Sequence, residues 1–75
     1  MDNSIEMINA LESHYKAQLD RISLDINNTL RGGNGSGALD YLTDSISEYS
    51  STLSQFNFVQ KLKENVMKEA KQDEG

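Results

Sequence analysis

All the internal glycines of this chain lie in one short segment, and no proline occurs in its 75 residues. These glycines are Gly32, Gly33, Gly35 and Gly37. Glycine and proline are the residues that most often interrupt helices, so the stretches on either side can each form one long helix. We expect Gly32 or Gly33 to end the first helix in the left-handed conformation that glycine adopts most easily.

Apolar residues on both sides of the glycine segment recur at intervals of three and four, the period of an amphipathic helix. The first set is Ile5, Ile8, Leu11, Tyr15, Leu19, Ile22, Ile26 and Leu30. The second set is Leu39, Leu42, Ile46, Tyr49, Leu53 and Phe56. The sequence therefore predicts an all-α chain with a helix over about 3–31, a loop over 32–37 and a helix over about 38–71.

A connection this short is typical of neighbouring helices that run antiparallel, so residues 1–75 are predicted to form a single helical hairpin. Folding the two sets together brings their apolar faces into contact along one hairpin seam. The residues predicted at this seam are Tyr15, Ile22, Ile46, Tyr49, Leu53 and Phe56.

The apolar pattern of the second helix changes after Phe56, and its most aromatic stretch lies at this point. Phe58 follows Phe56 by two residues and so points about 200° away from it around a helix. A chain this short buries little surface alone, and it has no cysteine with which to form a disulfide. We therefore expect contacts with other copies through a predicted subunit interface. Its residues are Phe58, Val59, Leu62 and Val66.

The composition argues against several classes of function. The net charge of −5 disfavours nucleic acid, which needs a basic surface. His14 is the only histidine, and the serines and carboxylates form no nucleophile and base arrangement, so we expect no enzyme, metal or cofactor. The glycine segment lacks the lysine and preceding strand of a phosphate-binding loop. The acidic start and the absence of a long apolar run predict synthesis in the cytoplasm, with neither a cleaved signal peptide nor a membrane span.

Three segments after the glycines resemble the subunits that form the needle of type III secretion systems, and the related inner-rod subunits. The pattern Tyr-x-x-x-Leu-Ser-x-Phe-Asn-Phe over residues 49–58 is similar to the family's Tyr-x-x-x-Leu-Ser-x-Tyr/Phe-Asn-Leu/Phe. Residues 38–42, Ala-Leu-Asp-Tyr-Leu, resemble the apolar start of its second helix. Residues 65–68, Asn-Val-Met-Lys, resemble its Asn-x-Val-Lys segment. The resemblance covers residues 38–71.

This resemblance implies a bacterial structural subunit that is exported unfolded to the cell surface and stacks with other copies into a hollow helical filament. It also implies dedicated cytoplasmic chaperones and tip proteins as partners. The amphipathic pattern alone leaves a second hypothesis open, in which the hairpin forms a dimeric four-helix bundle and acts as an adaptor or a secretion co-chaperone.

Overall fold

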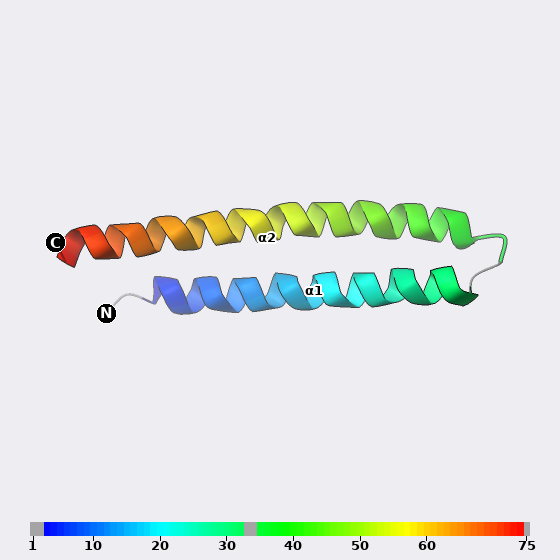
Figure 1. Ribbon diagram of the computed structural model, residues 1–75, viewed down its shortest axis with the longest axis horizontal. Coiled ribbons are helices and arrows are strands. Elements are labelled where there is room, and N and C mark those ends of the chain that lie inside the picture. The colour runs from blue at the N-terminus through cyan, green and yellow to red at the C-terminus, as the bar shows by residue number, and fades with distance from the viewer. Residues whose placement is uncertain (1–2, 33–34, 75) are drawn as a thin grey trace.

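The computed structural model describes residues 3–32 and 35–74, with side chains described as far as residue 69. Helix α1 runs over Ser4–Gly32 and helix α2 over Ala38–Glu74. The two helices lie side by side and antiparallel (Figure 1), in a rod with extents of 60 by 15 by 14 Å. The predicted all-α helical hairpin is confirmed.

The helices begin where backbone carbonyls can accept the first helical hydrogen bonds. The carbonyl oxygen of Asn3 accepts a bond from the Met7 N–H at 3.0 Å, and that of Gly37 accepts one from the Tyr41 N–H at 3.0 Å. Glu6 and Asp40 lie in the two first turns, where a negative charge is favourable to the helix dipole.

The glycine segment differs in detail from the prediction. Gly32 is still part of α1, and no described glycine has a positive φ, so the left-handed conformation expected at Gly32 is not adopted there. The alternative position, Gly33, lies outside the described residues. Helix α2 continues to Glu74, three residues beyond the predicted end, and its C-terminal end extends past the start of α1 (Figure 1).

The side of α2 that faces α1 follows one unbroken series of alternating four- and three-residue steps, as in a coiled coil. The buried and half-buried residues of this series are Ala38, Leu42, Ser45, Tyr49, Thr52, Phe56, Val59, Lys63 and Val66. The change of pattern predicted after Phe56 is therefore wrong. Ser45 and Thr52 hold inward positions with polar side chains, so a search for apolar residues selects Ile46 and Leu53 in their place.

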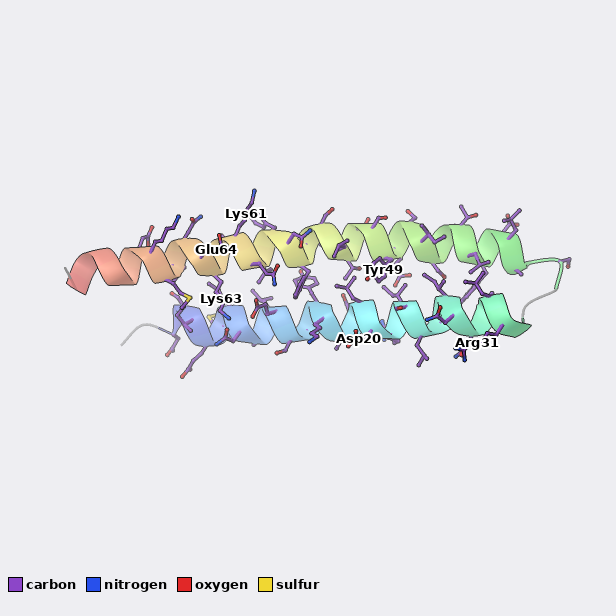
Figure 2. The ribbon with its side chains drawn as sticks, in the orientation of Figure 1. Asp20, Arg31, Tyr49, Lys61, Lys63 and Glu64 are labelled. Atoms are coloured by element: carbon purple, nitrogen blue, oxygen red, sulfur yellow. The ribbon has the colours of Figure 1, made fainter. Side chains whose placement is uncertain are left out.

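The inward side of α1 has the same spacing and also includes polar residues. It consists of Ile5, Ile8, Glu12, Tyr15, Leu19, Ile22, Ile26 and Thr29. Glu12 and Thr29 take the positions that the apolar pattern gave to Leu11 and Leu30, both of which are exposed. Lys63 points toward α1 (Figure 2) and its Nζ lies 3.2 Å from Glu12 Oε1, so the charges of this inward pair are matched.

Candidate self-assembly surface

A single hairpin leaves most of its large apolar side chains uncovered. Among the described residues four hydrophobic side chains are buried, Ile8, Leu19, Ile22 and Val59. Eleven large hydrophobic side chains are exposed, four of them on α1 and seven on α2. Two helices can cover only one side of each other, so the outer apolar side chains need another neighbour.

Two contacts identify the two flanks of the hairpin. On one flank the Tyr41 hydroxyl donates a hydrogen bond to Asp25 Oδ2. On the other flank Lys16 and Gln60 line one shallow hollow together with Phe56. Tyr41 directly precedes the inward Leu42, whereas Gln60 directly follows the inward Val59. In a coiled coil these two kinds of position, next to the inward residues in sequence, lie on opposite flanks of the seam.

A line of apolar residues runs along the Gln60 flank toward the loop. We name it the loop-end stripe, and it consists of Leu39, Ile46 and Leu53. Each lies a whole number of heptads before Gln60, so all three share its flank. Their exposed fractions are 76%, 56% and 39%. The next outer positions on this side of α2 are the uncharged Thr43, Ser50 and Asn57. Depletion of charge around apolar side chains is typical of the core of a protein interface.

A second group of apolar residues lies on the Tyr41 flank, away from the loop. We name it the open-end patch, and it consists of Met7, Leu11, Phe58 and Leu62. Leu62 lies three heptads after Tyr41, and Leu11 lies two heptads before Asp25. The neighbouring Glu12 and Lys63 contact each other, which places Leu11 and Leu62 at the same level of the rod. Met7 and Phe58 each lie one turn away on the same helix face, and all four side chains are exposed.

The predicted seam residues divide into two groups. Ile22 is buried, and Tyr15, Tyr49 and Phe56 are half-buried on the inward sides of their helices. Figure 2 shows Tyr49 between the two helices. Ile46 and Leu53 lie instead at the edge of the seam, in the loop-end stripe, because each directly follows an inward position. The seam predicted from sequence therefore contained two residues of the outer surface.

The residues predicted at a subunit interface also divide. Phe58 is 62% exposed and Leu62 is exposed beside it, so both are available to a second copy. Val59 is 5% exposed because it packs in the interhelical core, and Val66 is half-buried on the same inward series. Val59 is therefore removed from the candidate surface. The loop-end stripe was missed as an outer surface, although its regular seven-residue spacing could have indicated it.

A polar hollow of about 520 Å³ lies between the helices on the Tyr41 flank, near the loop. Its polar lining residues are Arg21, Asp25, Asn28, Tyr41, Asp44, Ser45 and Glu48. No group of three or more metal-ligating side chains is found in the part of the chain that the structure describes. Neither helix, over its described residues, is apolar enough along its length to cross a membrane.

The hydrogen bond to Asp25 raises the pKa of Tyr41 above its ordinary value, and desolvation and the negative charge of Asp25 add to this effect. The contact thus contributes stability below the ordinary tyrosine pKa, and this contribution is lost as the pH rises through the raised pKa. We expect Asp25→Asn to lower the pKa of Tyr41. An ultraviolet titration of the tyrosinate band checks this, with Tyr41→Phe to assign the transition, and an unchanged pKa would contradict the contact.

The ion pair between Glu12 and Lys63 should help to fix how the two helices align. Glu12→Lys would place two positive charges at one level of the seam, and we expect a lower melting temperature. Combining it with Lys63→Glu should recover the loss, with a coupling of about 1 kcal/mol because the pair is only partly buried. Thermal melting of the two single variants and the double variant measures this coupling. Strictly additive effects would show that the pair does not align the helices.

Comparison of the chain with protein-family models, with curated proteins and with solved structures finds no match. The candidate surface is therefore judged on its own geometry and on the sequence resemblance described above.

Proposed function

We propose that this chain is a structural subunit that assembles with many copies of itself into a filament, and that the filament is the needle or inner rod of a type III secretion apparatus. The observation that supports assembly is the exposed apolar surface of the hairpin, which includes two separate regions on opposite flanks. The resemblance over residues 38–71 supports the particular kind of filament.

Self-association also suits the size of the molecule. One long face of the rod has extents of 60 by 15 Å. This corresponds to about 900 Å², close to the roughly 800 Å² that each partner buries in a stable interface of standard size. The described helices bury few apolar side chains within one chain, so contacts repeated at every copy would supply stabilisation that the lone hairpin lacks.

The proposal includes export from the bacterial cytoplasm to the cell surface, with cytoplasmic chaperones and tip proteins as further partners. It assigns no catalytic role, cofactor or metal to the chain. Export can be tested by comparing the culture medium of bacteria with and without a working type III apparatus. Appearance of the protein in both media, or in neither, would contradict this part of the proposal.

The concentration dependence of particle size tests assembly directly. We expect light scattering and sedimentation to show a series of growing species that ends in filaments visible by electron microscopy. A single compact dimer at all concentrations would instead support the adaptor or co-chaperone hypothesis, in which two hairpins form a closed four-helix bundle.

Phe58 provides a specific variant for this measurement. Phe58→Ala should leave the helical content of the isolated chain nearly unchanged, since the ring is exposed in the hairpin. It should weaken self-association strongly, because burial of one aromatic ring contributes about 1.5–3 kcal/mol at each contact. Circular dichroism and light scattering at matched concentrations measure both quantities. Association equal to that of the wild type would remove Phe58 from the assembly surface.

A further inference from the structure

We propose that neighbouring copies associate head to tail, with the loop-end stripe of one copy packed on the open-end patch of the next. This inference rests on the proposed function and specifies which surfaces make the contact. The partner is a second copy of this chain, and each copy contributes a different surface to the contact.

The position of the two apolar regions argues for this arrangement. The stripe lies on the Gln60 flank toward the loop, and the patch lies on the Tyr41 flank toward the other end. A symmetric contact of stripe with stripe would bury one region and leave the patch of both copies exposed. A contact of stripe with patch covers both regions on every inner copy. Such a contact does not use the same surface twice, so it can continue without closing.

The charges near the two regions permit this pairing. Asp44 and Glu48 line the hollow on the Tyr41 flank, so these acidic side chains lie away from the stripe. Lys63 is already paired with Glu12, whereas Lys61 shares a hollow with Phe58 at the edge of the patch. A stripe bordered by uncharged side chains can therefore pack on the patch without bringing like charges together.

The side chains around the two regions also permit close approach. The stripe is flanked on α2 by the small or uncharged Thr43, Ser50 and Asn57. Phe58 shares a shallow hollow with Ser54, Asn57 and Lys61, and Lys61 projects away from α1 (Figure 2). Small neighbouring side chains and an outward-pointing lysine thus leave room for the apolar side chains of the stripe and the patch to pack.

Two variants disable one surface each. Ile46→Lys places a charge in the stripe, and Phe58→Lys places the same charge in the patch. Both positions are exposed in the isolated hairpin, so both variants should fold, as circular dichroism can verify. Ser47→Lys is the matched control, because it makes the same charge change at an exposed position outside both regions. We expect each of the two variants alone to require a concentration at least about tenfold higher for association, and Ser47→Lys to assemble like the wild type.

An equimolar mixture of Ile46→Lys and Phe58→Lys decides the question. The first variant keeps an intact patch and the second an intact stripe, so analytical ultracentrifugation should show a one-to-one dimer that does not grow. Two results would overturn the head-to-tail contact and leave the filament proposal standing. One is a Phe58→Lys variant that dimerises alone. The other is a mixture that remains monomeric while the wild type forms filaments. A wild type that stops at a dimer would overturn the filament proposal itself.

Discussion

Replacing Ile22 by alanine is expected to unfold much of the hairpin at ambient temperature, whereas the same replacement at Ile46 is expected to have little effect on the isolated chain. Ile22 is 6% exposed at the centre of the seam. Removing a buried isoleucine side chain costs about 2–5 kcal/mol. A small domain has a total stability of only about 5 kcal/mol, so this loss is a large fraction of the whole.

Ile46 provides a matched control because the chemical change is identical. Its side chain is more than half exposed, and an exposed apolar residue loses little when it is shortened. Thermal melting followed by circular dichroism, at concentrations where light scattering shows only monomers, measures both variants. The apolar pattern of the sequence had placed both residues in the seam. Equal destabilisation by the two variants would support that placement of Ile46 and contradict the packing described for α2.

The general form of the molecule was predictable because it depends on features that are unambiguous in the sequence. Every internal glycine lies in one segment, and both flanking stretches have the period of a helix. Inward residues with large apolar side chains, such as Leu19, Ile22 and Phe56, could be identified in the same way. Together with the short connection, these features are enough to predict two helices and their antiparallel direction.

The details of the seam were not predictable by the same method, because polar residues occupy some of its positions. Ser45, Thr52 and Lys63 all face α1, and an apolar residue directly follows the first two. A pattern search therefore moves to Ile46 and Leu53, one residue away, and places them inside. One residue corresponds to about 100° around a helix, so this small error exchanges an outer surface for the core. The loop-end stripe became visible only once the inward series was known.

Val59 shows the opposite error. The apparent change of pattern after Phe56 suggested that Val59 belongs to a new, outward-facing set together with Phe58. In the hairpin the inward series continues without interruption, and Val59 lies three residues after Phe56 within it. Phe58 remains outside whichever series is chosen, since it is two residues from Phe56 and one from Val59. Its exposure was therefore predictable from its position relative to Phe56, whereas the outward position expected for Val59 was wrong.

Exchanging the two buried hydroxyl residues for apolar ones, Ser45→Ala together with Thr52→Val, is expected to raise the melting temperature by about 10 °C. Ser45 and Thr52 are 7% and 6% exposed. Burying a hydroxyl costs desolvation free energy that a methyl group does not. No buried side-chain oxygen of the described residues lacks a hydrogen-bond partner, and such bonds offset only part of the desolvation cost. Alanine is also a better helix former than serine by about 0.5 kcal/mol. A total gain of about 2 kcal/mol corresponds to this shift for a domain of this size.

A control variant separates burial from helix propensity. Ser47→Ala together with Thr43→Val makes the same two chemical changes at exposed positions of α2. The difference in melting temperature between the two double variants measures the effect of the buried hydroxyls. If the control melts as high as Ser45→Ala with Thr52→Val, the hydroxyls in the seam do not limit stability.

The same variants connect stability to the proposed function. A subunit that is exported unfolded must lose its hairpin before passage, and a seam that contains hydroxyls lowers the cost of unfolding. Under this proposal Ser45→Ala with Thr52→Val should reach the culture medium more slowly than the control variant, while assembling at least as well in vitro, because neither residue lies in the stripe or the patch. Equal export of the two variants, measured by quantitative immunoblotting at equal intracellular levels, would show that the stability of the seam does not limit export.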